Sequence, residues 1–546
     1  MSAQEFDYII VGAGSAGCTL ANRLTEDRGV KVAVIEAGGP DRGFWIRIPL
    51  GWGRILERRL HDWQYHTEAE PQLGGRRIEC ARGKVVGGSS TINAMAYVRG
   101  HRGDYDRWAA SGLTRWSYAH VLPYFRRQET WEGGADAYRG GDGPLRTRMS
   151  RYVKYDPVID AYLEAGRAAG YPFTQDYNGA HQEGFALMQS TIHRGRRVSG
   201  ADAYLRPALG RGNLVLETDA HVTRVLFQGD RAAGVEYLRG GRRFAVLAAR
   251  EVILCGGSIN SPQLLMLSGI GDPDELSAHG IPVKAPLRGV GKNLQDHLSV
   301  AVEYRRKGAG PFAKNMRLDR IAIELARAYF LGTGFATELP SGFMAFLKSG
   351  PDAALPDIQL LFRGVPPGGG AYLPPFKSAF ADGFACRAVL LRPESRGTVA
   401  LASADPAAPP RIRQNMLAAG RDWIGIRAGV RLVQALGRER PLAPFIDAEL
   451  GPGAATRSDT DLDAYIRESA ATAHHPLGTC RMGIDTDSLA VVDAELKVRG
   501  VDGLRVVDAS VMPDLVGGNI NGPVVMIAEK AADLIRGKAP LAAVGV

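Results

Sequence analysis

The chain begins its regular pattern with Phe6-Asp-Tyr-Ile-Ile-Val-Gly-Ala-Gly-Ser-Ala-Gly17, an apolar run that leads into a Gly-x-Gly-x-x-Gly turn. The run predicts a buried parallel strand, and the turn predicts the start of a helix. Gly12 allows the tight turn, Gly14 lets backbone N–H groups approach a pyrophosphate, and Gly17 lets the helix pack closely on the strand. The N-terminus of that helix adds partial positive charge where phosphates would bind.

A second apolar run, Val32-Ala-Val-Ile-Glu36, strengthens this interpretation. Glu36 follows Gly17 by 19 residues, which is the separation at which an acidic side chain meets a ribose hydroxyl. Strand, turn, helix, second strand and acid together predict a dinucleotide-binding unit. They do not specify which dinucleotide binds.

The composition is that of a large α/β protein. The chain has 546 residues, of which 45% are hydrophobic, so it can bury more than one domain or one large composite domain. The polar start at residues 1–5 leaves no room for a signal peptide, and no apolar run approaches the roughly 18 residues of a membrane span. We therefore expect a cytoplasmic protein, with peripheral contact to a membrane left open.

Charge and cysteine content exclude several other classes of protein. The net charge of +9 is spread over many arginines, which indicates a solvated surface and no nucleic-acid partner. No Cys-x-x-Cys pair occurs, so the sequence indicates neither a disulfide framework nor a zinc site. The five cysteines are scattered along the chain: Cys18, Cys80, Cys255, Cys386 and Cys480.

Further elements follow from the pattern of apolar residues. Residues 213–254 contain short alternating runs, which predict a β-meander returning to the main sheet, and residues 261–268 predict a helix. The stretch 300–395 is rich in proline and glycine, and we expect it to form a second domain with long loops over a sheet. Residues 503–508 and 526–535 predict a closing strand and helix.

Five longer motifs identify a family. They are Gly83–Asp106, Gly257–Gly271, Gly291–His297, His475–Thr479 and Val507–Pro513. Through these motifs and their order, the chain resembles the glucose–methanol–choline (GMC) oxidoreductases along nearly its whole length. The resemblance implies an α/β protein with a Rossmann-like FAD-binding domain and a second, α+β substrate domain built on a β-sheet.

The resemblance also implies a division of the chain. We expect residues 1–155, 195–300 and 470–546 to form a discontinuous FAD-binding domain. Residues 156–194 and 301–469 would form the substrate-binding domain.

The activity implied is FAD-dependent oxidation of a primary alcohol to an aldehyde, by hydride transfer to flavin N5. Oxygen, a quinone or another acceptor would reoxidise the flavin. Choline dehydrogenase and a pyridoxine-type oxidase stay open as alternatives, the latter because of Arg197-Val-Ser-Gly-Ala-Asp202 and the doubled histidine. From other classes, a hydroxynitrile lyase with structural FAD and an NAD-dependent dehydrogenase also stay open. The sequence leaves the oligomeric state undetermined.

Two residues carry the chemistry by resemblance. His475 matches the catalytic base, and an imidazole near neutral pH is suited to accept a hydroxyl proton. The second active-site residue falls on Asn521, whose amide can hydrogen-bond the substrate oxygen without competing for its proton. His297, in the Gln-Asp-His motif, is interpreted as a structural hydrogen-bonding residue.

The FAD contacts are also assigned by resemblance. Glycine-rich backbone suits this role, because N–H groups reach an anion only where side chains are absent. The assigned residues are Gly12, Gly14, Ser15, Glu36, Ala37, Trp63, Arg82, Val86, Gly88, Asn93, Ala94, Met95, Val222, Asp508, Ala509, Asn521 and Pro523.

Three positions depart from the family pattern. Ile92 stands where relatives with covalent flavin have a histidine, so we predict non-covalent FAD. His474 precedes His475 where a bulky aromatic is frequent, and the two imidazoles would couple their titrations if both faced the site. Choline-oxidising relatives carry a glutamate that here matches Leu339, with Glu338 beside it, which weakens the choline alternative.

Overall fold

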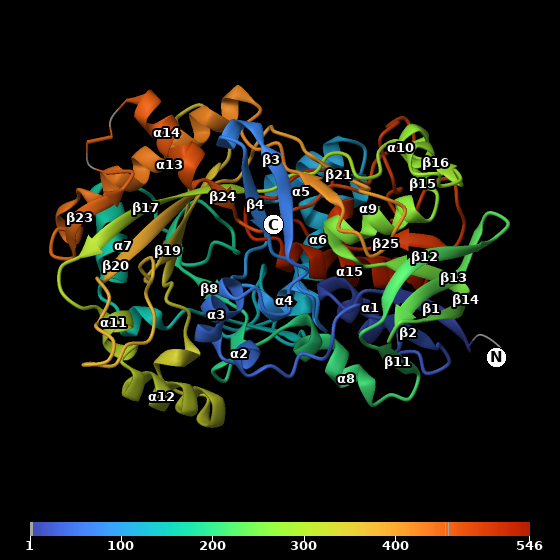
Figure 1. Cartoon of the computed structure of the whole chain (residues 1–546), viewed down its shortest axis with the longest axis horizontal. Helices are drawn as coiled ribbons and strands as arrows, with labels where there is room; N and C mark the ends of the chain where they lie inside the picture. The colour runs from blue at the N-terminus through green and yellow to red at the C-terminus, as the bar shows by residue number, and fades with distance from the viewer. Residues whose placement is uncertain (1–3, 454, 457) are drawn as a thin grey trace.

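Two seven-stranded β-sheets organise the molecule. The structure is a computed structural model that describes residues 4–453, 455–456 and 458–546. The first sheet lies on the right of Figure 1 and the second on the left, with helices packed around both. The predicted fold class is confirmed: an α/β nucleotide-binding unit is joined to a second unit built on a sheet.

The first sheet has the strand order β11-β2-β1-β14-β13-β12, with β25 beside β14. Strand β1 runs parallel to β2 and β14, whereas β12, β13 and β14 form the predicted antiparallel meander. The parallel register brings the ends of these strands to one edge, where Val11 lies beside Ile35 and Leu254. The strands are β1 (Gln4–Val11), β2 (Val32–Ile35), β11 (Leu214–Glu217), β12 (His221–Gln228), β13 (Arg231–Arg239), β14 (Arg242–Leu254) and β25 (Leu504–Val506).

The glycine turn after β1 allows no other residue at two positions. Gly12 has φ +101°, and a Cβ there would lie 2.6 Å from the Cys255 carbonyl oxygen. A Cβ on Gly17 would lie 1.9 Å from the Gly12 carbonyl oxygen. These contacts let helix α1 (Ser15–Leu24) start directly at the sheet edge and pack against α15 (Asn521–Ile535).

The second sheet has the order β23-β17-β20-β19-β18-β7, and all of these pairs are antiparallel. One face packs on helices α7 (Val158–Ala168) and α13 (Gly420–Gly437) through a core that includes Phe343, Leu360 and Phe384. The strands are β7 (Gly184–Leu187), β17 (Leu298–Arg306), β18 (Phe343–Leu347), β19 (Ile358–Arg363), β20 (Gly383–Leu390) and β23 (Ile446–Gly451), with β24 (Ala471–Thr472) on β17.

The strands of the two sheets come from different predicted segments of the chain. Strands of the first sheet fall within 1–155, 195–300 and 470–546, and those of the second fall within 156–194 and 301–469, except that β17 begins at Leu298 and β24 pairs with it. The division into domains itself stays a prediction. The predicted helices at 261–268 and 526–535 both begin earlier, as α9 (Gly257–Leu267) and α15.

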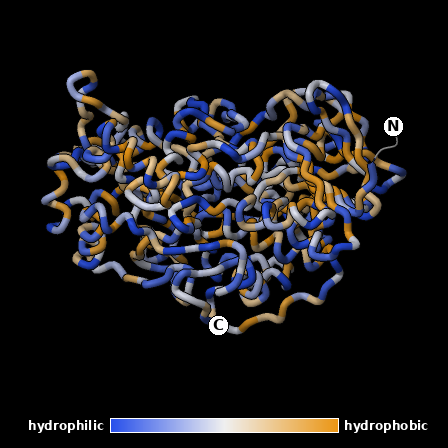
Figure 2. The backbone as a smooth tube through the Cα atoms, turned by 90° about the horizontal axis from the view of Figure 1, so that it is seen from below, coloured by the Kyte–Doolittle hydropathy of each residue, from blue (hydrophilic) through white to orange (hydrophobic). Residues whose placement is uncertain are grey.

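Hydrophobic segments gather inside the molecule at the end that carries the N-terminus, where Figure 2 shows the densest orange. None of the helices in the described part of the chain has the length and apolar character to cross a membrane. Other elements are β3 (Tyr65–Glu70), β4 (Arg76–Cys80), α3 (Trp52–Glu57), α4 (Ser89–Ile92), α5 (Arg102–Ala110), α6 (Tyr118–Gln128), α12 (Leu318–Ala326) and α14 (Asp459–Ser469).

Candidate active site

A cavity of about 370 Å³ lies between the two sheets. Its walls include the residues that follow the ends of β1, β2 and β14, namely Gly12, Glu36 and Cys255. The opposite wall includes residues of β18, β19 and β20. Ligands of parallel α/β sheets bind outside the carboxyl ends of the strands, so the cavity lies where the fold predicts a nucleotide.

Glu36 fixes the turn at the nucleotide end of the cavity. Its carboxylate accepts hydrogen bonds from the backbone N–H of Ala13 at 2.7 Å and of Gly38 at 2.8 Å. Burial raises the pKa of Glu36 to about 7, although both donors favour its ionised form. No side chain caps α1, whose N-cap residue is Gly14, so the first N–H groups of the helix are left for an anion.

A second glycine turn lies at this end of the cavity, and its geometry shows whether a dinucleotide fits there. Gly88 has φ +54°, and a Cβ there would lie 2.7 Å from the Cα atom of Gly14. The two backbones therefore meet without side chains between them, as a pyrophosphate cradle requires. Asp508 ties a third segment to this site by accepting from the N–H of Gly257 at 2.8 Å and the hydroxyl of Ser261 at 2.6 Å. The residues present fit FAD.

All but two of the predicted FAD residues line the cavity. Val86 and Pro523 are the exceptions, and both are buried behind its wall. Contact of the others with FAD stays a prediction. Those that line the cavity are Gly12, Gly14, Ser15, Glu36, Ala37, Trp63, Arg82, Gly88, Asn93, Ala94, Met95, Val222, Asp508, Ala509 and Asn521.

The loop that carries His475 is held by the Gln-Asp-His motif. The backbone N–H of His475 donates to Asp296 at 2.8 Å, and the N–H of Ala473 donates to the His297 carbonyl at 2.8 Å. The other Asp296 oxygen accepts from Gln414 at 2.8 Å. Burial raises the pKa of Asp296 to about 6. The motif therefore fixes the position of a loop that is about 180 residues away in sequence.

Hydrogen-bond chemistry determines the tautomer of His297. Its Nε2 atom lies 3.1 Å from the Leu391 carbonyl oxygen, and a carbonyl can only accept, so Nε2 carries the hydrogen. Burial lowers the pKa of His297 to about 4, so the ring is neutral at neutral pH. Its Nδ1 atom is therefore an acceptor.

The tautomer of His475 follows from that of His297. The two Nδ1 atoms are 2.9 Å apart, so the Nδ1 of His475 carries the hydrogen that is shared between them. Burial, with smaller contributions from His297 and His474, lowers the pKa of His475 well below its usual value, which keeps this ring neutral as well. His475 therefore presents an unprotonated Nε2 atom, as a general base must.

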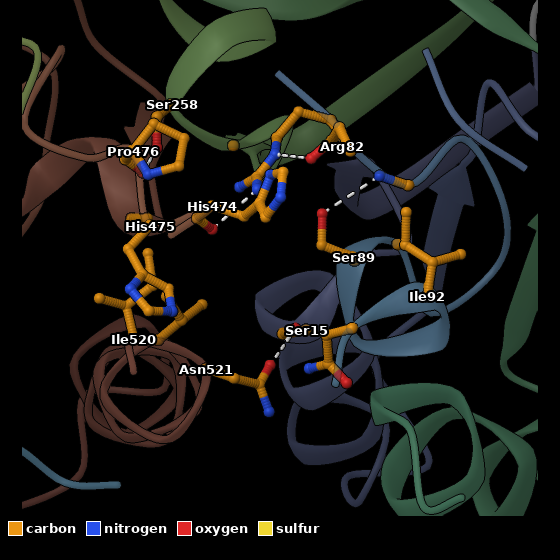
Figure 3. A pocket seen from close by; sticks show the side chains of 18 of the residues that line it. Ser15, Arg82, Ser89, Ile92, Ser258, His474, His475, Pro476, Ile520 and Asn521 are labelled. Atoms are coloured by element: carbon orange, nitrogen blue, oxygen red, sulfur yellow. Dashed lines mark hydrogen bonds between the residues drawn. The ribbon is translucent and has the colours of Figure 1, made fainter. Parts of the chain in front are cut away.

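Asn519, which the sequence did not single out, contacts this lone pair. Its Nδ2 atom lies 3.0 Å from the His475 Nε2 atom, and its Oδ1 atom accepts from Gln359 at 3.2 Å. The Asn521 Oδ1 atom instead accepts from the Ser15 hydroxyl at 2.7 Å, as Figure 3 shows. The amide beside the candidate base is thus Asn519, because Asn521 is the first residue of α15 and its side chain reaches α1.

His474 also lines the cavity, in an uncommon backbone conformation. Its φ is +64°, which is rare for a residue with a side chain. Its carbonyl accepts from Arg82 at 2.8 Å (Figure 3). Its N–H donates to Thr472 at 2.7 Å. Burial, followed by Arg82, lowers its pKa to about 3, so His474 is neutral beside the neutral His475.

Glu338 does not face the cavity. Its carboxylate pairs with Arg148 at 2.7 Å and accepts from the N–H of Arg151 at 3.1 Å. Leu339 lines the cavity in its place. The carboxylate that the sequence offered for a cationic substrate is therefore engaged elsewhere.

Fold and site together define a class of protein. A dinucleotide cradle shares one cavity with a neutral histidine whose Nε2 atom is unprotonated and lies beside the Asn519 amide. This is the arrangement of a nucleotide-dependent oxidoreductase that acts on a hydroxyl group.

Comparison with known proteins identifies the family. Residues 6–299 and 393–528 match the two family models described as GMC oxidoreductase. The chain is 45% identical to the mitochondrial choline dehydrogenase of Homo sapiens, covering 99% of this chain and 91% of that protein. It is 44% identical to the oxygen-dependent choline dehydrogenase of Brucella anthropi, covering 98% of this chain and 97% of that protein.

Solved structures agree with this likeness. Pyridoxine 4-oxidase from Mesorbium loti superposes with a TM-score of 0.87 at 33% identity, covering 98% of this chain and all of that one. Formate oxidase from Aspergillus oryzae superposes with a TM-score of 0.89 at 28% identity, covering 98% of this chain and 99% of that one. The chain belongs to the GMC oxidoreductase family. It is an FAD-dependent enzyme that acts on CH–OH donors.

Proposed function

We propose that the enzyme oxidises a primary alcohol to an aldehyde, with His475 as the base that accepts the hydroxyl proton. The observation that carries the proposal is the unprotonated Nε2 atom of His475, held in the cavity by the relay from Leu391 through His297. FAD, when bound, supplies the acceptor for the hydride. The alcohol loses the O–H proton to Nε2 and the C–H hydrogen with its electron pair, so the C–O bond becomes a carbonyl.

Asn519 lies directly beside the atom that would accept the proton. Its Nδ2 group lies 3.0 Å from the His475 Nε2 atom, so one substrate oxygen can contact both. An amide N–H stabilises the negative charge that develops as the proton leaves and does not itself accept that proton. We therefore propose Asn519, rather than Asn521, as the second active-site residue.

The nucleotide end would hold FAD through backbone groups. The N–H groups of the Gly12–Ser15 turn and of the Gly88 turn would bind the pyrophosphate, and Glu36 would meet the adenosine ribose. Ile92 lines the cavity with a hydrocarbon side chain, which cannot form a covalent bond to the flavin. FAD would therefore be held without a covalent link.

An anaerobic titration tests the proposal. Addition of a primary alcohol should bleach the oxidised flavin and yield one aldehyde per FAD. Admission of oxygen afterwards separates an oxidase, whose colour returns at once, from a dehydrogenase that needs another acceptor. A flavin that no alcohol bleaches, together with cyanide release from a cyanohydrin, would overturn the redox assignment in favour of a lyase.

A variant tests the role of His475. We expect His475→Ala to slow flavin reduction by about 100-fold or more, because general-base catalysis contributes roughly that much. FAD content should stay at the wild-type value, since the nucleotide cradle is built from other segments. Reduction at the wild-type rate would contradict the assignment of the base.

A further inference from the structure

The cavity wall opposite the nucleotide cradle is one face of the second sheet. Alternate residues of neighbouring strands point to the same face, and Leu361 on β19 lies directly opposite Arg387 on β20. Arg363, two residues beyond Leu361, shares this face, and all three line the cavity. On β17, Ser299 belongs to the same face. The other face of the sheet is the apolar core, so charge on this wall faces the ligand.

Two arginines on this wall differ in their partners. Arg363 pairs with the Glu303 carboxylate at 3.1 Å. Arg387 donates to the Ser299 hydroxyl, and among the described residues no carboxylate lies within 4.0 Å of its guanidinium nitrogens. Burial and the neighbouring Arg363 lower the pKa of Arg387 to about 10, so it is still a cation at neutral pH.

Arg387 shares the reacting end of the cavity with the candidate base. Its positive charge contributes to the lowered pKa of both His474 and His475. Arg387 is half-buried, and a partly desolvated cation without a counter-ion is unfavourable, so proteins normally pair it. The described part of the chain supplies no anion for Arg387, so a ligand that brings one would complete the site.

We propose that the substrate is an alcohol that carries a carboxylate, bound by Arg387 while its hydroxyl group meets His475 and Asn519. The inference rests on the proposed alcohol oxidation and adds the class of substrate. A guanidinium binds a carboxylate through two parallel N–H···O bonds, which fixes the orientation of the molecule. A quaternary ammonium would instead meet a like charge on this wall, with Glu338 already engaged by Arg148.

Matched alcohols test the inference in the wild-type holoenzyme. The set is 4-(hydroxymethyl)benzoate, benzyl alcohol and choline, each assayed for kcat/KM with an artificial electron acceptor. We expect the carboxylate to be used about 10- to 100-fold better than benzyl alcohol, since hydrogen bonds to charged groups contribute on that order. Choline should be the poorest of the three.

Variants of Arg387 then test whether this residue causes the preference for the carboxylate. Arg387→Gln should remove the preference, so that kcat/KM for 4-(hydroxymethyl)benzoate falls by that factor relative to kcat/KM for benzyl alcohol, and Arg387→Lys should retain part of the preference. Arg305→Gln is the matched control, because Arg305 lies on β17 and pairs with Asp447 at the surface. That control should keep the wild-type preference.

Each outcome is decisive. If none of the three alcohols reduces the flavin, the proposed function fails rather than the substrate class. If benzyl alcohol or choline is preferred by the wild type, the substrate class is wrong although the alcohol oxidation holds. If Arg387→Gln slows every alcohol equally, Arg387 serves the cofactor or the fold, and the inference is overturned. The wild-type comparison decides the question even if the Gln variant does not fold.

Discussion

Replacement of His297 gives the sharpest test of the histidine relay. His297 is fully buried, and it contacts His475 through Nδ1 at 2.9 Å and Leu391 through Nε2 at 3.1 Å. His297→Phe keeps a ring of similar size but offers no acceptor to the Nδ1–H of His475. His297→Asn is the matched variant, because its amide oxygen can replace the lost acceptor. Both variants lose the contact with Leu391, and the acceptor offered to His475 is the difference that the comparison tests.

The size of the effect follows from the lost hydrogen bond. A buried N–H left without a partner costs about 1–3 kcal/mol. His475 can avoid this by moving its hydrogen to Nε2, the atom that must accept the substrate proton. To react, it must then return to the less stable tautomer, so we expect the rate of flavin reduction in His297→Phe to fall about 5- to 150-fold. His297→Asn should recover most of that rate.

Anaerobic stopped-flow spectroscopy measures the reduction rate and the substrate affinity separately. The reduction rate should fall while the affinity for substrate stays unchanged, because His297 does not line the cavity. Flavin absorbance per mole of protein checks that both variants bind FAD. Wild-type reduction in His297→Phe would refute the tautomer argument, as would an Asn variant no faster than the Phe variant.

Three further predictions follow. Asn519→Ala should slow flavin reduction by about tenfold or more, because it removes the amide beside His475. Asn521→Ala should instead weaken FAD binding, because it removes the contact with Ser15. Reduction kinetics and an FAD titration measure the two effects, and the reverse pattern would contradict the assignment. The reduction rate should fall only at a pH well below 6.5, because burial lowers the pKa of His475 and activity is lost as that ring becomes protonated. A midpoint at or above 6.5 in the pH profile of the reduction rate would contradict this prediction. Acid precipitation should release all of the FAD into the supernatant, and yellow colour retained in the washed pellet would show a covalent link.

Local patterns predicted the strand, turn and helix at the nucleotide end of the cavity. The Gly12–Glu36 unit is continuous in sequence, and its turn geometry is dictated by contacts that only glycine tolerates. Glu36 and Gly14 therefore lie where strand and helix periodicity place them. Such a unit can be predicted because the residues that determine it are neighbours along the chain.

The amide beside His475 could not be predicted in this way. Asn519 and Asn521 stand two residues apart in Gly518-Asn-Ile-Asn, and both would suit the same chemistry. The start of α15 at Asn521 turns that side chain to Ser15 and leaves Asn519 beside His475. A difference of two residues at a helix start depends on tertiary packing, which sequence patterns do not resolve.

The sequence around Arg387 indicates that this residue has a special role. It is the only charged residue in Gly383-Phe-Ala-Cys-Arg-Ala-Val-Leu390, a run buried on both faces. A charge inside such a strand marks a polar partner, a ligand or an ion pair. Only the register with β17 and β19 shows that it faces the cavity and that Glu303 pairs with Arg363 instead.

The second sheet fixes the loop of His475 and also forms the cavity wall that carries Arg387. The loop of His475 is fixed where β24 pairs with the first residues of β17, directly after His297. Arg387 lies on the neighbouring β20 opposite Ala301 of β17, and its side chain donates to the Ser299 hydroxyl, which in turn donates to the Ala471 carbonyl of β24. The hydrogen bonds that set the tautomer of His475 run through His297 to Leu391 and include no atom of Arg387, whereas the Ser299–Ala471 contact connects Arg387 to the strand before that loop.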